Sequence, residues 1–374
     1  MMRDAETAEM KALLHKIRRS PLLWLLVFMP AVFVVEHVRP AAATLLFALS
    51  ILAIVPLAAL LSHATESVAA KTGDAVGGLL NATLGNLTEL VIALSALRAG
   101  EYLLVKATVA GAIVTNALFM LGGAFFLGGL KYHEQEFNRT GVRFQAGMLF
   151  LATIALLIPS AVGAVDSIEA NRFAETLSVC LAVVLIATYC LGLLFSLGTH
   201  RDTFGAGAHH PEPDDAPLPI GVALGVLGVV TILVALVAEI FVESIQGAAE
   251  TLGMSKAFVG FIIVALVSAA GEIAAAFSGA RKNRLDLSVG IALGSATQIA
   301  LFVAPVLVLA SYVLGPAPMT LQFWPGAVLM VLVSTLTAAL VSGTGRSVWF
   351  TGVLVLAVYL TFAITLYLLP PQPG

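Results

Sequence analysis

Two stretches decide the fold of this chain: LLNATLGNLTELVIALSAL at residues 79–97 and FVGFIIVALVSAAGEIAAAFSG at residues 258–279. Each is apolar and rich in small residues, and each carries one acidic residue, Glu89 or Glu272. A carboxylate at bilayer depth costs several kcal/mol, so it is rare and marks a functional site by default. The two glutamates therefore predict one paired site inside a membrane protein.

The composition supports a polytopic, all-α membrane protein. Of the 374 residues, 59% are apolar and only 11% are charged, whereas about a quarter of a soluble domain is charged. A span needs about 20 residues as a helix and about half that as a barrel strand, so the long apolar segments are expected to be helices. The chain contains eleven such segments, at roughly 21–38, 42–62, 76–97, 104–130, 144–162, 174–197, 219–241, 256–279, 287–313, 323–343 and 347–369.

The basic residues predict the orientation of the chain. With a cytoplasmic N-terminus, the predicted inside ends and loops contain 14 of the 19 Lys and Arg residues, as the positive-inside rule requires. Eleven spans then place the C-terminus outside. The basic run at 281–284 is interpreted as an orientation signal, so no nucleic-acid partner is expected. These features favour a bacterial inner (plasma) membrane.

An internal repeat relates the two halves of the chain. The sequence separation between Glu89 and Glu272 is here called the repeat interval. A shift of the sequence by this interval also brings Arg98 onto Arg281, without a gap. Five segments separate the glutamates, so the two copies insert in opposite directions. Inverted repeats are typical of secondary transporters that bind their substrate near the midplane. The predicted division is one segment (1–40, including a short N-terminal cytoplasmic helix), a five-helix repeat (41–198), a cytoplasmic acidic linker (199–218) and a second five-helix repeat (219–374).

Small and polar side chains accompany each glutamate. Residues three and four apart share a helix face, which places Gly85 and Asn86 beside Glu89, and Ser268 and Ala269 beside Glu272. Amides and hydroxyls in apolar helices bond to neighbouring helices. The helix that follows each glutamate carries further residues of this kind: Gly111, Thr115 and Asn116 in the first copy, and Gly294, Ser295, Thr297 and Gln298 in the second.

Two carboxylates that face each other in a low-dielectric site repel, so either protons or a divalent cation must neutralise them. Hard cations such as Ca²⁺ take six to eight oxygen ligands. No Cys or His lies near either glutamate in the sequence, which disfavours a soft-metal site. A site that holds protons or one divalent cation in turn is typical of an exchanger. We expect no cofactor besides the transported cation and no enzyme activity.

The motifs resemble the cation/proton exchanger (CAX-type Ca²⁺/H⁺ antiporter) family of the Ca²⁺/cation antiporter superfamily. GGLLNATLGNLTEL (77–90) and RKNRLDLSVGIALGSATQIALFVAP (281–305) are close to two motifs of that family, and the resemblance covers nearly the whole chain. It implies an eleven-helix exchanger with Glu89 and Glu272 as primary cation ligands. It further implies shell carbonyls near Gly85 and Ser268, and supporting or ion-path residues at Asn86, Thr88, Thr115, Asn116, Ser295, Gln298, Glu66 and Glu239.

The second repeat departs from the family pattern. Where the family reads GNAAEH, this chain reads SAAGEI at 268–273, so an asparagine becomes Ala269 and a histidine becomes Ile273. The expected function is Ca²⁺/H⁺ exchange by alternating access, with altered selectivity. An exchanger for Na⁺, K⁺ or Mn²⁺, or Na⁺-coupled Ca²⁺ exchange, stays open, and a passive channel is a weaker alternative. An intramembrane hydrolase lacks a nucleophile or aspartate pair with catalytic spacing.

Overall fold

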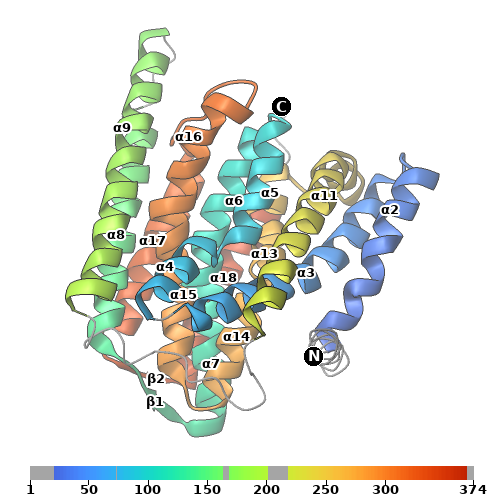
Figure 1. Ribbon diagram of the computed structural model, residues 1–374. Helices are drawn as coiled ribbons and strands as arrows, with labels where there is room; N and C mark the ends of the chain where they lie inside the picture. The colour runs from blue at the N-terminus through green and yellow to red at the C-terminus, as the bar shows by residue number, and fades with distance from the viewer. Residues whose placement is uncertain (1–20, 73, 163–167, 201–217, 369–374) are drawn as a thin grey trace.

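The computed structural model describes the whole chain except residues 1–20, 73, 163–167, 201–217 and 369–374. Predictions that fall on the N-terminal helix and on nearly all of the linker at 199–218 lie outside the described residues. The described chain is a helix bundle with one small two-stranded sheet (Figure 1).

The first half of the chain runs from η1 to η3. Its elements are η1 (Pro21–Val27), α2 (Phe28–Val38), α3 (Ala43–Lys71), α4 (Asp74–Leu84), α5 (Leu87–Arg98), α6 (Tyr102–Val114), η2 (Thr115–Met120), α7 (Leu121–Tyr132), β1 (Glu134–Glu136), α8 (Arg139–Val162), α9 (Ile168–Leu193) and η3 (Leu194–Thr199).

The second half follows with the same kinds of element. These are α11 (Ile220–Leu252), α12 (Lys256–Phe258), η6 (Val259–Val264), α13 (Ala265–Ser268), α14 (Ala270–Arg281), α15 (Leu285–Gln298), η7 (Ile299–Val303), α16 (Ala304–Leu314), α17 (Pro325–Ser342), β2 (Arg346–Val348) and α18 (Trp349–Leu368).

The prediction of a polytopic, all-α membrane protein is confirmed. Among the described residues, eight helices are long and apolar enough to cross a membrane, and a ninth span is possible if the bent pair Lys256–Ser268 and Ala270–Arg281 counts as one. The predicted count of eleven is not established. The first predicted segment is a shorter apolar helix, Leu22–Val38, and the third divides into α4 and α5.

Corresponding helices of the two halves are related by the repeat interval found in the sequence. Helix α14 begins and ends one repeat interval after α5, and α15 begins one repeat interval after α6. A π-helical turn interrupts the same span in both halves, as η2 and as η7. Local sequence therefore sets these helix ends in the same way in each half.

Both glutamate segments are broken helices, where the sequence predicted continuous ones. Helix α4 ends at Leu84 and α5 begins at Leu87, and α13 ends at Ser268 before α14 begins at Ala270. The second break bends the chain by 59°. Glycine accounts for the first break, because a Cβ on Gly85 would lie 2.6 Å from the carbonyl oxygen of Asn81.

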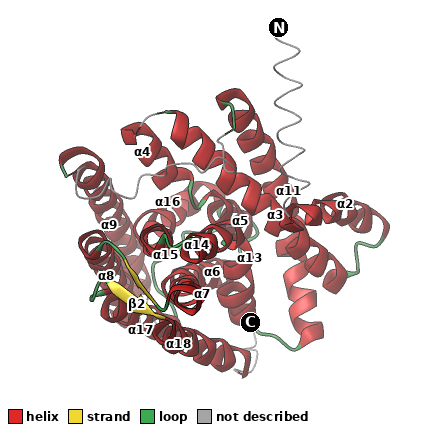
Figure 2. Cartoon of the chain, turned by 90° about the horizontal axis from the view of Figure 1, so that it is seen from below, coloured by secondary structure: helices red, strands yellow, loops and turns green. Residues whose placement is uncertain are grey.

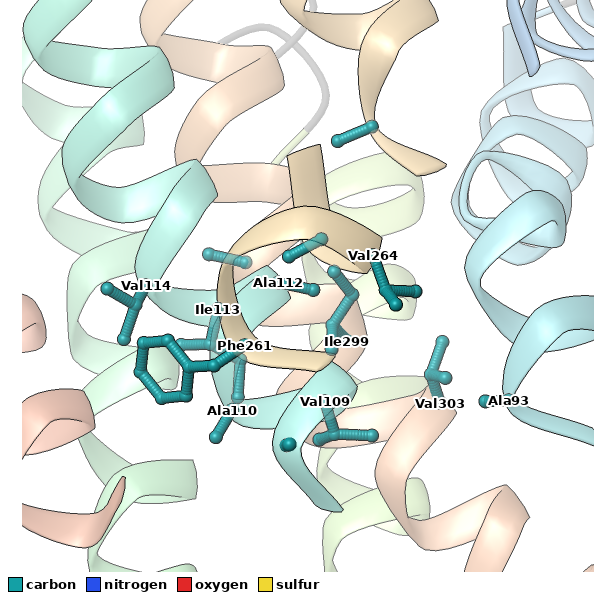
Figure 3. Close-up of a cluster of buried hydrophobic side chains, with 14 of the residues drawn as sticks. Ala93, Val109, Ala110, Ala112, Ile113, Val114, Phe261, Val264, Ile299 and Val303 are labelled. Atoms are coloured by element: carbon teal, nitrogen blue, oxygen red, sulfur yellow. The ribbon is translucent and has the colours of Figure 1, made fainter. Parts of the chain in front are cut away.

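Part of the buried apolar core lies where α6 meets η6 and η7 (Figure 3). Gly260 of η6 lies against the side chains of Leu104 and Ala107 in α6, and small residues at such positions let helix backbones approach closely. Figure 3 shows the apolar side chains that fill this contact, among them Val109, Ile113, Phe261, Val264, Ile299 and Val303.

Strands β1 and β2 form an antiparallel pair at the lower end of the bundle in Figure 1, in which Glu136 pairs with Arg346. The Arg346 guanidinium also forms ion pairs with Glu136 at 2.7 Å and Glu134 at 3.5 Å. Between these residues, Gln135 is buried and its amide nitrogen donates to the carbonyl oxygen of Ala280 and to Asn283. The sheet thereby holds the C-terminal end of α14, which is the helix that carries Glu272.

Seen from below, α14 and α15 lie centrally and α4 lies toward the rim (Figure 2).

Candidate functional site

Each predicted glutamate lies in the first turn of a helix that follows a break. Glu89 is in the first turn of α5 and is 4% exposed, and Glu272 is in the first turn of α14 and is half-buried. A helix N-terminus carries a partial positive charge that stabilises a carboxylate within the first turn. The breaks therefore orient a favourable backbone dipole toward both acidic side chains.

The fold brings the two carboxylates together at the interface of the two halves. Glu272 lies close enough to Glu89 for the two negative charges to repel. The side chain of Ser268 lies near Glu89 and that of Ser295 lies near Glu272, while their hydroxyls donate to the Ala265 carbonyl oxygen and to Asn86. One buried oxygen of each carboxylate, Oε1 of Glu89 and Oε2 of Glu272, has no hydrogen-bond donor within the described part of the chain. A proton, a cation or water would complete these acceptors.

A chain of hydrogen bonds links the halves beside this pair. The Asn116 amide nitrogen donates to the Ser295 hydroxyl at 2.8 Å, and that hydroxyl donates to the Asn86 amide oxygen at 2.6 Å. All three side chains are buried. Asn86 is the residue that precedes α5, and its hydrogen bond to Ser295 joins its amide to a side chain that lies near Glu272.

Gly85 and Gln298 are also neighbours. A Cβ on Gly85 would lie 3.5 Å from the Gln298 side-chain oxygen, so the bare backbone at the first break faces this amide. Gln298 is 7% exposed, and its nitrogen has no acceptor among the described residues. The two residues predicted from different halves of the sequence thus lie side by side.

The remaining predicted residues lie around this centre or away from it. Glu66 on α3 is half-buried, accepts a hydrogen bond from Ser62 at 3.4 Å and lies near Glu272. Thr88 is buried in α5. By contrast, Glu239 is an exposed residue of α11, and its carboxylate forms an ion pair with Arg98 at 3.4 Å.

Thr115 contacts a residue that the sequence did not single out. Its hydroxyl lies 3.3 Å from that of Tyr359, a buried residue of α18. The only available signal was a phenol within the apolar segment 347–369. Tyr359 thus helps to hold the π-helical turn that carries Thr115 and Asn116.

The second half of the site is poorer in polar groups, as the SAAGEI stretch indicates. Ala269 is fully buried and Ile273 is half-buried, so neither position offers an oxygen or a nitrogen from its side chain. Among the described residues, no group of three His, Cys, Asp or Glu side chains could hold a metal ion. A bound cation would therefore need amide or hydroxyl oxygens, backbone carbonyls and water besides the two glutamates.

Comparison with known proteins supports the family resemblance drawn from the motifs. The family model described as sodium/calcium exchanger protein matches residues 42–198 and 222–368. The Ca(2+)/H(+) antiporter of Aphanothece halophytica is 41% identical over 341 residues, which cover 88% of this chain and 91% of the relative. The Ca(2+)/H(+) antiporter of Synechocystis sp. is 40% identical over 363 residues, which cover 93% and 97%.

The fold is also that of a solved relative. The structure of native YfkE superimposes with a TM-score of 0.81 at 35% identity, covering 94% of this chain and 100% of that one. The resemblance drawn from the motifs is thereby confirmed. The chain belongs to the sodium/calcium exchanger protein family.

Proposed function

We propose that this protein is a secondary active Ca²⁺/H⁺ antiporter that binds its ions at Glu89 and Glu272. The observation that carries the proposal is the pair of buried carboxylates, contributed by opposite halves of the chain, each with an oxygen that lacks a partner among the described residues. The antiporter names of the relatives at 40% and 41% identity support it.

The site can satisfy these oxygens in two mutually exclusive ways. Protons neutralise the carboxylates one at a time, whereas one divalent cation neutralises both at once. The carbonyl groups at the breaks, near Gly85 and Ser268, and the amide of Asn86 would supply additional oxygens to a bound cation. Release of protons on cation binding, and the reverse, is what couples the two fluxes.

Different packing of the two halves supports alternating access. Element η6 of the second half is packed onto α6 of the first half, where a Cβ on Gly111 would lie 2.1 Å from the Phe261 carbonyl oxygen. The corresponding contact, one repeat interval away, would join Gly294 of α15 to Gly78 of α4. Instead, a Cβ on Gly294 would meet only the Gln145 amide, at 3.3 Å, and Gly78 faces Leu197. The η6–α6 contact is therefore closed, whereas the corresponding α4–α15 contact is open. This difference is expected of one state of an exchanger in which the two repeats exchange their conformations during transport.

A different cation is the second candidate, and the buried Ala269 favours it. An asparagine there would add an amide oxygen to the shell, and its loss weakens the preference for Ca²⁺, which takes six to eight oxygens. Exchange of Mn²⁺, Na⁺ or K⁺ for protons, or Na⁺-coupled Ca²⁺ exchange, would use the same two carboxylates.

The proposed setting is a bacterial inner (plasma) membrane with the N-terminus in the cytoplasm and the C-terminus outside. Bacterial relatives support the membrane, and the distribution of Lys and Arg supports the orientation. In this arrangement two five-helix repeats, 41–198 and 219–374, insert in opposite directions.

Vesicles test the function directly. The purified protein is reconstituted, an acid interior is imposed, and Ca²⁺, Mn²⁺, Na⁺ or K⁺ is added in turn while a pH-sensitive dye reports the interior. We expect Ca²⁺ to dissipate the pH gradient. Dissipation by another cation alone would support exchange of that cation for protons, and no response to any cation would refute cation/proton exchange.

A further inference from the structure

The hydrogen-bond chain between Asn116, Ser295 and Asn86 leaves one atom unpaired at each end. In the present direction, Asn116 donates to Ser295 and Ser295 donates to Asn86. The buried atoms without a partner among the described residues are the Asn116 oxygen and the Asn86 nitrogen. The side chains of Asn116, Ser295 and Asn86 are 0%, 5% and 1% exposed, so water cannot readily complete these groups.

This direction is wrong for holding a cation. The Asn86 oxygen is occupied by the Ser295 hydroxyl, and the group it leaves free is an NH₂, which only donates hydrogen bonds. A hard cation requires the oxygen.

The opposite direction costs no hydrogen bond. If both amides turn by half a revolution about their terminal torsions and the hydroxyl rotates, Asn86 donates to Ser295 and Ser295 donates to the Asn116 oxygen. The oxygen and the NH₂ of an amide are nearly the same size, so the helices need not move. The unpaired Asn116 oxygen is already in place to accept, and the Asn86 oxygen becomes free.

We propose that Ser295 is a positioning residue whose hydroxyl decides whether Asn86 presents an oxygen or an NH₂ to the ion site, with Asn116 as its alternative acceptor. This inference rests on the proposed function and assigns to that site the group that controls its amide ligand. The cation-bound protein would hold the reversed chain.

Only one half of the site has such a chain. The positions one repeat interval away from Asn86, Ser295 and Asn116 hold apolar, buried side chains: Ala269, Ala112 and Ile299. Whether Asn86 offers its amide oxygen to the site therefore depends on the direction of this one hydrogen-bond chain.

Two substitutions of Asn116 separate a reversible chain from a fixed one. In Asn116→Leu, Ser295 loses the Asn116 acceptor, and the neighbouring Glu272 carboxylate is engaged by the bound cation. The hydroxyl therefore keeps the Asn86 oxygen occupied, and we expect the Kd for Ca²⁺ to rise about tenfold. In Asn116→Asp, titrated at a pH high enough to ionise the buried carboxyl, the carboxylate can only accept. The hydrogen-bond chain is then held in the reversed direction, and the Kd should equal or fall below that of the unsubstituted protein at the same pH. If the hydrogen-bond chain cannot reverse, both variants should weaken Ca²⁺ binding, because both remove the Asn116 NH₂ that donates to Ser295.

The measurement is calorimetric titration of Ca²⁺ into the purified full chain, with thermal unfolding to show that each variant is folded. Ser295→Thr keeps the hydroxyl and should bind like the unsubstituted protein, whereas Ser295→Ala should resemble Asn116→Leu. The double variant Ser295→Ala/Asn116→Asp tests whether the new carboxylate binds the ion itself, and we expect it to lose the affinity of Asn116→Asp.

The outcomes distinguish this inference from the proposed function. Equal affinities of Asn116→Leu and Asn116→Asp, or a double variant as tight as Asn116→Asp, would overturn the inference. If the expected pattern of Kd values appears while vesicles show no cation-driven proton movement, the exchange function fails and the role of Ser295 stands. Absence of Ca²⁺ binding by the unsubstituted protein would overturn both.

Discussion

Gly111 in α6 lies directly against the backbone of Phe261 in η6: a Cβ on Gly111 would be 2.1 Å from the Phe261 carbonyl oxygen and 2.4 Å from its Cα. Residues from the two halves of the chain meet here with no side chain between them. Only glycine permits this approach, because the obstructing atoms belong to the backbone and cannot rotate away.

Gly111→Ala should therefore destabilise the protein. Overpacking a core typically costs about 1–3 kcal/mol, so thermal unfolding in detergent should show a lower Tm than for the unsubstituted protein. Gly147→Ala in α8 is the matched control, because a Cβ there meets nothing within 4 Å among the described residues. An unchanged Tm for Gly111→Ala would contradict the contact.

Gly294→Ala should separate stability from transport. In this structure the added Cβ meets only the flexible Gln145 side chain at 3.3 Å, so the Tm should change little. If α4 packs onto α15 in the other state as η6 packs onto α6 here, the same methyl group blocks that state, and exchange should fall about tenfold or more. Full exchange by a stably folded Gly294→Ala would argue against that packing.

Glu89→Gln and Glu272→Gln should each abolish cation-driven proton movement, because an amide neither releases a proton nor neutralises a cation. Vesicles with an acid interior report the loss. Glu250→Gln is the control of the same chemistry, since Glu250 is an exposed residue of α11 whose carboxylate accepts a hydrogen bond from the Gln246 amide at 3.3 Å. It has no place in the proposed site, so this variant should retain exchange. Full exchange by either Glu89→Gln or Glu272→Gln would show that the paired site is wrong.

Restoring the family residues in the second repeat should strengthen Ca²⁺ exchange. Ala269→Asn adds an amide and Ile273→His adds a titratable imidazole beside Glu272. The double variant should raise the rate of Ca²⁺-driven proton movement and change its pH dependence. The two single variants show which substitution is responsible for the change. Each variant is checked by thermal unfolding, because Ala269 is fully buried. No change in apparent Ca²⁺ affinity or in pH dependence would count against this role for the two positions.

Several features of the site were predictable because local sequence carries them. Glu89 and Glu272 are conspicuous in apolar surroundings, and the repeat interval that relates them recurs in the ends of α5 and α14. The helix breaks were not predicted, although Gly85 signalled the first. The second occurs at Ser268 and Ala269, where neither residue type marks a helix end.

Contacts between distant residues were beyond prediction. Asn116 and Ser295 are 179 positions apart, and Thr115 and Tyr359 are 244 apart. A polar residue in an apolar helix indicates that it needs a partner, but not which partner. Glu239 is a further example, because the sequence grouped it with the ion path but did not indicate Arg98, with which the fold pairs its carboxylate.

The sequence by itself determined that the chain is a helical membrane protein with two related halves and one acidic residue at the heart of each. Hydrophobicity and repetition are properties of the chain read in order, so they require no fold. Only the tertiary structure decided that these carboxylates meet and that Ser295 bridges Asn86 and Asn116. It also decided that η6 packs tightly on α6 while α4 does not pack in this way on α15. Those relationships depend on how helices from opposite halves pack, and packing is a property of the whole bundle.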